Sequence, residues 1–389
     1  MKYATLSGTY VTFPRPACLP LKDIEGNMSQ QLKFINKDYS SFFTVVKKRV
    51  DSYFTDKRLS KHANGAMVLK TVFYIACMVI SYGLILTGIF PPLIQLLLAV
   101  SLGISMALIG FNICHDALHG SYSANKKVNK GLGLLFNLIG ANAYVWTIAH
   151  NIVHHTYTNI PGHDEDIEIA PGLIRISQGD KVHRIQRYQH IYAFFLYGLT
   201  SLSWFFRKDY VKFFQKKIGN HRNKHPKIEY FNLFFYKIIY YAIFIAAPLL
   251  VLDITWWQFL IGYLAMNIAE GLVLGLVFQL AHVVEGTDFP DPDSQGNIQE
   301  AWAVHQMMTT ANFASKSRIA HFLCGGLNLQ IEHHLFPKIC HIHYKALSGI
   351  VKATALEFNL PYNENRTFYT ALKSHYFVLK RMGRMPDSA

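Results

Sequence analysis

Charged residues are scarce in this chain of 389 residues: Asp, Glu, Lys and Arg together make up 16%, against 51% hydrophobic residues. An ordinary soluble domain contains roughly 25% charged residues. The deficit comes from long windows with almost no charge, which is typical of a membrane protein. Aromatic residues reach 14%, and this excludes an intrinsically disordered chain because such chains are poor in aromatics.

Cysteine is also scarce, and the start of the chain shows no secretory pattern. The five cysteines are odd in number, widely spaced and without a Cys-x-x-Cys pair. Neither a disulfide framework nor thiolate-bound zinc is therefore expected. Because no apolar segment follows the first residues, we expect no signal peptide.

The sequence lacks the common signatures of several enzyme classes. It contains no P-loop, no Gly-x-Gly-x-x-Gly fingerprint, no Gly-x-Ser-x-Gly elbow and no His-Glu-x-x-His motif, which argues against the corresponding nucleotide-binding, hydrolase and zinc-protease classes. The absence of Glu-x-x-His argues against a carboxylate-bridged di-iron bundle. A His-Pro-Gly-Gly haem-binding signature is missing, so we expect no fused cytochrome b5 domain.

Four apolar windows are long enough to cross a bilayer, which takes ~20 residues. They lie at about residues 66–90, 93–114, 231–252 and 256–280. The turns between them are short, so we expect an all-α integral membrane protein with four transmembrane helices in two hairpins and a cytoplasmic helical cap. Two shorter apolar stretches, Leu132–Trp146 and Ile191–Phe206, are predicted to be interfacial or re-entrant helices.

The charge distribution predicts the orientation. The loop at residues 115–230 has fifteen Lys and Arg against eight Asp and Glu, whereas the two hairpin turns have no Lys or Arg. The positive-inside rule places this loop and both termini in the cytoplasm. It also accounts for the net charge of +14 without a nucleic-acid partner, and we expect none. We predict a multi-pass protein of the bacterial inner membrane.

Three regions follow from this topology. Residues 1–65 are predicted to form a cytoplasmic N-terminal segment with a surface helix at Phe42–Phe54, where apolar residues recur at helical spacing. Residues 66–350 would form the membrane domain, and residues 351–389 a cytoplasmic C-terminal tail. The candidate site is expected at the cytoplasmic boundary of the membrane domain.

Histidine is abundant, with 19 residues. Three clusters and one single histidine lie at the predicted membrane boundary: His115 and His119; His150, His154 and His155; His333 and His334; and His282. Helical side chains three or four positions apart share a face, so each cluster can direct its imidazoles at one point. A lone histidine is usually a satisfied core residue, but eight at one depth predict a metal site. They exceed the needs of one tetrahedral zinc and suit two ions, whose identity imidazole alone leaves open among iron, copper, zinc and nickel.

The three clusters, called histidine boxes one, two and three in chain order, and their placement around two hairpins resemble the membrane fatty acid desaturase family over roughly residues 65–350. The segments Thr158–Ile160, Asp164–Glu168 and Asn328–Pro337, with Gln330 opening the third box, resemble the linoleoyl-CoA or front-end (Δ5/Δ6-type) branch. The lack of a haem-binding signature resembles its stand-alone bacterial members.

The resemblance implies a set of site residues. Two iron ions would be held by the eight histidines His115, His119, His150, His154, His155, His282, His333 and His334. Gln330 and His305 are additional candidate ligands. Asp116, Asp164, Asp166 and Glu332 adjoin ligands and are candidates to accept their second N–H. His163, His321, His341 and His343 fit no box position, and we expect them to support the site or lie on the surface.

The resemblance also implies the reaction. The protein would be a fatty acid desaturase that uses O2 to introduce a cis double bond into a fatty acyl chain carried by CoA or a lipid. Its electrons would come from a separate donor, a ferredoxin or cytochrome b5 with its reductase. The alternative is a di-iron membrane hydroxylase or ketolase acting on an acyl chain or a carotenoid. A metal transporter is disfavoured, because the only charges inside the apolar windows are Lys70, Lys237 and Glu270.

Overall fold

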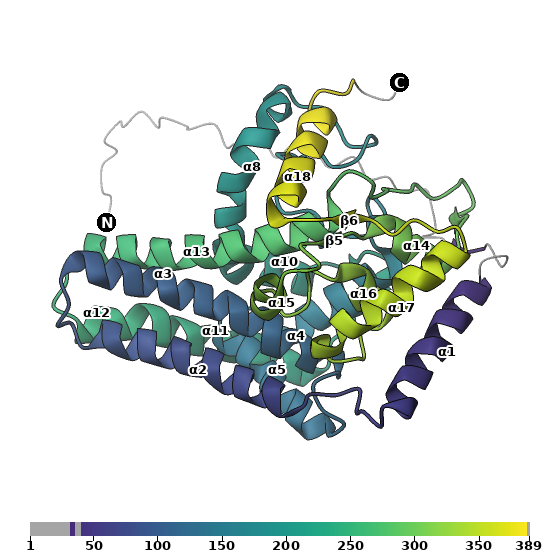
Figure 1. Cartoon of the computed structure of the whole chain (residues 1–389). Coiled ribbons are helices and arrows are strands. Elements are labelled where there is room, and N and C mark those ends of the chain that lie inside the picture. The colour runs from purple at the N-terminus through teal and green to yellow at the C-terminus, as the bar shows by residue number, and fades with distance from the viewer. Residues whose placement is uncertain (1–31, 36–39, 387–389) are drawn as a thin grey trace, which may run out of the picture.

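The computed structural model describes residues 32–35 and 40–386 and is mostly helical (Figure 1). Much of the expected N-terminal segment 1–65 therefore lies outside the described residues. The expected all-α class agrees with this structure, and within the described residues only short strands occur, which form three two-stranded pairs. The pairs are β1 (Lys33–Phe34) with β4 (Asn297–Ile298), parallel; β2 (Lys217–Ile218) with β3 (His221–Arg222), antiparallel; and β5 (Asn312–Phe313) with β6 (Glu364–Asn365), parallel.

The four predicted apolar windows are confirmed as helical stretches long and apolar enough to cross a membrane. The first is α2 (Gly65–Leu86) and the fourth is α13 (Trp256–His282). The second joins α3 (Pro92–Ile109), the π-helical segment η1 (Gly110–Cys114) and α4 (His115–His119). The third joins α11 (Lys227–Tyr241), the π-helical segment η5 (Ala242–Ala246) and α12 (Ala247–Val251).

The ends of these helices follow from local sequence. The Asn64 side chain accepts a hydrogen bond from the backbone N–H of Met67 and so caps α2. Pro92 opens α3, where a missing N–H costs nothing. Thr255 and Gln258 form a capping box that starts α13. The chain therefore reverses at 87–91 and at 252–255 without a long loop.

Helices α3 and α13 lie side by side, and α2 packs along α3 (Figure 1). Their close approach depends on Gly103. A Cβ atom at this position would lie 2.0 Å from the carbonyl oxygen of Met266 on α13. Because that neighbour is backbone and cannot move aside, only glycine permits this crossing.

A sharply bent helix pair follows box one. Helix α5 (Lys126–Leu138) meets the stretch Ala143–Tyr157 at 111°, as a broken span or a re-entrant loop. This geometry agrees with the prediction of a re-entrant helix for Leu132–Trp146. The link contains Gly140 at φ +104, where a Cβ would lie 2.9 Å from the ring of Tyr240, so the bend requires glycine.

The stretch Ala143–Tyr157 consists of α6 (Ala143–Trp146), the π-helical segment η2 (Thr147–His154) and α7 (His155–Tyr157). The other short apolar window folds into α8 (Gln189–Gly198), α9 (Thr200–Ser203) and the π-helical segment η4 (Trp204–Lys208). Among the described residues it is not one of the candidate spans.

The remaining helices are α1 (Ser40–Asp56), the 3-10 helix η3 (Arg184–Tyr188), α10 (Asp209–Phe214), α14 (Trp302–Thr309), α15 (Arg318–Leu323), α16 (Gln330–Leu335), the 3-10 helix η6 (His341–His343), α17 (Tyr344–Glu357) and α18 (Phe368–Met382). Most of them lie toward the end of the spans that carries α4, whereas α18 stands beside α8 over α13 (Figure 1). The helix predicted at Phe42–Phe54 is present as α1. Its residues Phe42, Val46, Val50 and Phe54 are buried against α14, α16 and α17. This core includes Ile331 and Leu335 of α16, the helix that carries the third histidine box.

Candidate metal centre

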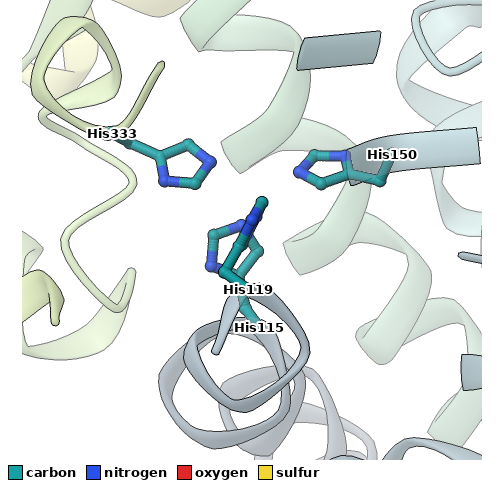
Figure 2. A group of neighbouring side chains, drawn as sticks. All are labelled: His115, His119, His150 and His333. Atoms are coloured by element: carbon teal, nitrogen blue, oxygen red, sulfur yellow. The ribbon is translucent and has the colours of Figure 1, made fainter. Parts of the chain in front are cut away.

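The structure brings all eight box histidines together in three overlapping groups. In each group, one ring nitrogen from every member lies within 4.8 Å of the others. The groups are His115, His119, His150 and His333; His154, His282 and His334; and His155, His333 and His334. Figure 2 shows the first group, in which His333 and His150 approach from opposite sides above the two histidines of α4.

Local helix geometry explains how box two contributes three imidazoles. His150 and His154 lie in η2 and His155 follows directly. A π-helix bonds residue i to i+5 and has a wider turn than an α-helix. Residues four and five positions apart then return to the same face, so His154 and His155 both lie near His150. A second π-helical segment, η1, directly precedes box one.

The centre contains an unusual number of buried nitrogens without a hydrogen-bond partner. Each leaves a desolvated polar atom unsatisfied, at a cost of about 1–3 kcal/mol in an ordinary core. So many at one point fit metal ions, which neutral imidazole binds readily. In the described residues they are the Nε2 atoms of His115, His119, His150, His154, His155, His333 and His334 and the Nδ1 atoms of His115, His155 and His282.

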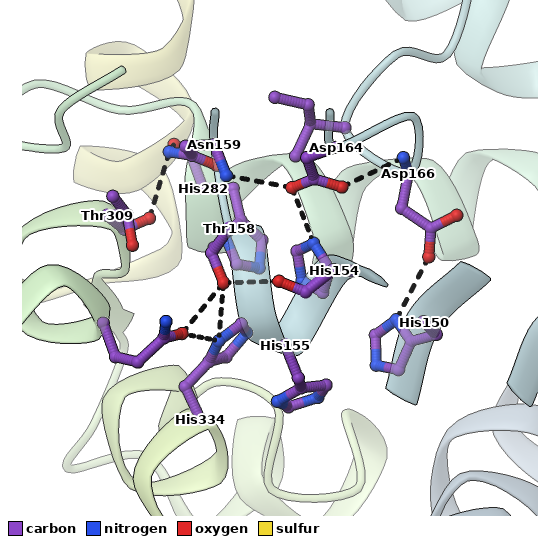
Figure 3. A network of polar contacts seen from close by, with 12 residues as sticks. His150, His154, His155, Thr158, Asn159, Asp164, Asp166, His282, Thr309 and His334 are labelled. Atoms are coloured by element: carbon purple, nitrogen blue, oxygen red, sulfur yellow. Dashed lines mark hydrogen bonds and ion pairs between the residues drawn. The ribbon is translucent and has the colours of Figure 1, made fainter. Parts of the chain in front are cut away.

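Two carboxylates hold the opposite nitrogen of two box-two imidazoles. His154 Nδ1 donates to Asp164 at 2.8 Å, and His150 Nδ1 lies 3.2 Å from Asp166 (Figure 3). Protonation of Nδ1 leaves the lone pair on Nε2, which faces the centre. Carboxylate–imidazole pairs of this kind orient the ring and raise its basicity as a ligand.

Neutral groups do the same for box three. His334 Nδ1 donates to the amide oxygen of Gln306 at 2.7 Å, and His333 Nδ1 lies 3.2 Å from the hydroxyl of Tyr344. Sequence reasoning missed both partners. Gln306 lies on α14 and Tyr344 on α17, and neither has a box spacing or a charge that would indicate its role.

Burial sets the protonation of the centre. Desolvation, followed by repulsion from neighbouring imidazoles, lowers the pKa of His333 and of His334 well below the ordinary value. Both rings are therefore neutral near pH 7 and can bind a metal. Burial disfavours the charged form of Asp166, but Lys212 at 2.8 Å and His150 hold its pKa well below the ordinary value.

Asp116 and Glu332 face other partners than the box imidazoles. Asp116 accepts hydrogen bonds from His341 Nδ1 at 2.8 Å and from the Cys340 thiol at 3.0 Å, whereas His115 Nδ1 is 4.0 Å away. His341 is thereby placed beside box one. Glu332 accepts hydrogen bonds from Asn312 and Tyr362, both at 2.8 Å. Consecutive residues of a helix point in different directions, so the side chain of Glu332 points away from those of His333 and His334.

The two additional candidate ligands differ in position. The Gln330 amide lies 2.9 Å from His282 Nε2, and its oxygen is buried without a partner, so Gln330 borders the second group. His305 belongs to none of the groups found in the described residues. Its ring packs against Phe34 with centroids 5.2 Å apart, and burial lowers its pKa to about 4.

A cavity adjoins the centre. His115, His150 and Gln330 form part of its wall, and Lys208 and Lys212 form another part. Most of the remaining wall is apolar and includes Phe111, Phe136, Trp146, Trp204, Leu274 and Phe278. Such a lining suits a hydrocarbon chain held beside the imidazoles.

Sequence comparison identifies the family. The fatty acid desaturase model matches residues 91–366 of this chain. The chain belongs to the fatty acid desaturase family. It is therefore an integral membrane oxidoreductase that acts on a fatty acyl chain.

Similar proteins lie in the front-end branch that the third box resembles. The chain is 36% identical to the sn-1 linoleoyl-lipid 6-desaturase of Synechocystis sp., over 92% of this chain and 99% of that protein. It is 35% identical to the protein of the same name from Arthrospira platensis, over 89% of this chain and 94% of that protein. It is 34% identical to an acyl-lipid (8-3)-desaturase of Physcomitrium patens, over 90% and 74%.

Proposed function

We propose that the eight box histidines hold two iron ions, and that the protein uses them with O2 to introduce a cis double bond into the acyl chain of a membrane lipid. The observation that carries this proposal is the convergence of buried, unpaired imidazole nitrogens in three overlapping groups. The names of the relatives favour a lipid carrier over CoA and a position close to the carboxyl end, at carbon 5 or 6.

The grouping suggests how the ligands divide. His115, His119, His150 and His333 would hold one ion, and His154, His282 and His334 the other. His155 belongs to a group with His333 and His334 and would complete the set between them. Gln330 remains a candidate beside the second ion. His305 would support the site by packing rather than by ligation, since it joins none of these groups.

The chemistry explains why metal is needed. The methylenes of an acyl chain have no usable acidity, so no side chain can remove their hydrogens as protons, and bound iron with O2 would supply the oxidant. The protein's own residues prepare the site. Asp164 and Asp166 would fix the orientation of His154 and His150. The apolar wall of the cavity would hold the chain and exclude water, which protects a reactive site from side reactions.

The same proposal includes topology and electron supply. The α2–α3 and α11–α13 segments would cross the membrane as two hairpins, with the helical cap and both termini in the cytoplasm. The excess of Lys and Arg at residues 115–230 supports this orientation, and we place the protein in a bacterial inner membrane. A separate ferredoxin, or cytochrome b5 with its reductase, would deliver electrons at the cytoplasmic face.

A fatty-acid profile tests the function. The chain would be expressed in a host with a ferredoxin or cytochrome b5 system, beside a His333→Ala/His334→Ala variant, and lipids analysed by gas chromatography–mass spectrometry. We expect a new unsaturated acid, absent from the variant, whose derivatised fragments place the double bond at carbon 5 or 6. A hydroxylated or keto product would contradict the proposal and favour the hydroxylase or ketolase alternative.

A further inference from the structure

Two lysines line the cavity beside the metal centre. Lys208 ends η4 and Lys212 lies one helical turn later, in α10. Lys212 is paired, since its ammonium donates to Asp166 at 2.8 Å, and Asp166 in turn contacts His150 Nδ1 at 3.2 Å. Lys212 is therefore two hydrogen bonds away from His150, a proposed metal ligand.

Lys208 lacks such a carboxylate partner. Its ammonium donates to the backbone oxygen of Glu168 at 3.1 Å. Across residues 32–35 and 40–386, no ion pair within 4.0 Å involves Lys208. An ammonium has three donors, so this group keeps hydrogen-bonding capacity on a cavity wall that also includes Asp166 and Asp209.

A poorly paired cation in such a place is costly. Burial, followed by repulsion from Lys212, lowers the pKa of Lys208 to about 8, although attraction from Asp166, Glu168 and Glu165 acts in the opposite direction. None of these carboxylates lies within 4.0 Å of the ammonium, so they compensate its burial only in part. An apolar side chain would be more stable there if the cavity only held hydrocarbon. A ligand with a negative or strongly polar oxygen would satisfy the ammonium.

We infer that Lys208 binds the oxygens at the carboxyl end of the acyl substrate and thereby sets which carbon faces the metal centre. This inference rests on the proposed function. A double bond at carbon 5 or 6 requires the carboxyl end to lie only a few carbons from the site. The lysines provide a polar anchor close to His150, and Leu274 and Phe278 of α13 provide an apolar wall for the rest of the chain. The oxygens come from the ester carbonyl or from the phosphate of the headgroup.

Equilibrium binding to the purified protein in detergent tests this anchor without turnover. The probes are octadecane, the methyl ester of a C18 fatty acid and a phosphatidylglycerol with the same chains. For Lys208→Met we expect roughly tenfold weaker binding of an oxygen-bearing probe and unchanged binding of octadecane. If Lys208→Met binds both oxygen-bearing probes more weakly, Lys208 contacts the ester carbonyl. If it binds only phosphatidylglycerol more weakly, Lys208 contacts the phosphate.

Two variants serve as controls. Lys208→Arg keeps the cation and should retain binding close to wild type, and Lys216→Met removes an exposed lysine and should change nothing. Equal binding of all three probes by Lys208→Met and wild type, with equal iron content, would overturn the inference. Because this assay requires no product, it separates failure of the anchor from failure of the proposed desaturation, which the fatty-acid profile reports.

Discussion

At the scale of single residues, the orientation of each imidazole depends on the group that holds its second nitrogen. Asp164 is buried and accepts hydrogen bonds from His154 Nδ1 and from the backbone N–H of Asn159. We predict that Asp164→Ala weakens metal affinity about 10–100-fold, because the ring loses its fixed tautomer. Metal titration of the metal-free protein measures this. Asp164→Asn, which keeps an acceptor, should lose less, and equal affinity for wild type and Asp164→Ala would contradict the assigned role.

His375 supports the site from a greater distance and gives a prediction on pH. Its Nδ1 donates to the carbonyl of Val283, next to His282, and its Nε2 accepts from Tyr197 at 2.8 Å. Burial lowers its pKa from 6.5 to about 4. Between these two pH values, His375 binds a proton in the unfolded chain but stays neutral in the folded chain. The free energy of unfolding should therefore fall as the pH drops from 6.5 towards 4, by on the order of 3 kcal/mol.

Thermal unfolding in detergent checks this dependence. His375→Asn removes the titrating ring, so its unfolding midpoint should fall less steeply with acid than that of wild type, although it starts lower. Other buried histidines contribute equally to both proteins, and the difference between the two curves isolates His375. Parallel curves over this pH range would show that His375 does not titrate as described.

At the scale of elements, the close contact of α3 with α13 helps to position two groups of ligands. Helix α4, which continues α3 through η1, carries His115 and His119, and the end of α13 carries His282. We predict that Gly103→Ala destabilises the protein by about 1–3 kcal/mol or more, since its Cβ would meet the backbone of Met266. Gly83→Ala on α2 is a matched control, because nothing lies within 4 Å of a Cβ there. Thermal unfolding should show a lower midpoint for the first variant only; equal midpoints would contradict the packing argument.

Element type could be predicted from the sequence where hydropathy determines it. The four helical stretches long and apolar enough to cross a membrane, and the amphipathic α1, follow from apolar residues at a continuous or helical spacing. The π-helical segments η1 and η2 could not be predicted, because no sequence pattern distinguishes their wider turn from an α-helix. The short pairs β1–β4 and β5–β6 also escaped prediction, since each joins two-residue segments far apart in the chain.

At the scale of the whole molecule, the convergence of the eight histidines was predictable. Box one and His282 follow the ends of predicted spans, and the other two boxes lie in segments predicted on the same side of the membrane. The side chains that surround these histidines could be predicted only in part. Asp164 and Asp166 adjoin box two in sequence and could be proposed as its partners. Gln306, Tyr344 and Lys208 reach the centre through the packing of α14, α17 and η4, and that packing is a tertiary property that no local pattern encodes.

The central claim of this account is that the chain holds two iron ions in these imidazole groups. The most direct measurement is the metal content of protein purified from iron-supplied cells, by elemental mass spectrometry against quantitative amino-acid analysis. The account predicts about two iron ions per chain for wild type and a clear loss of iron in His154→Ala and in His119→Ala, which alter different groups. One iron or less per chain in folded wild-type protein, or two ions of another metal in an enzyme that desaturates, would contradict it.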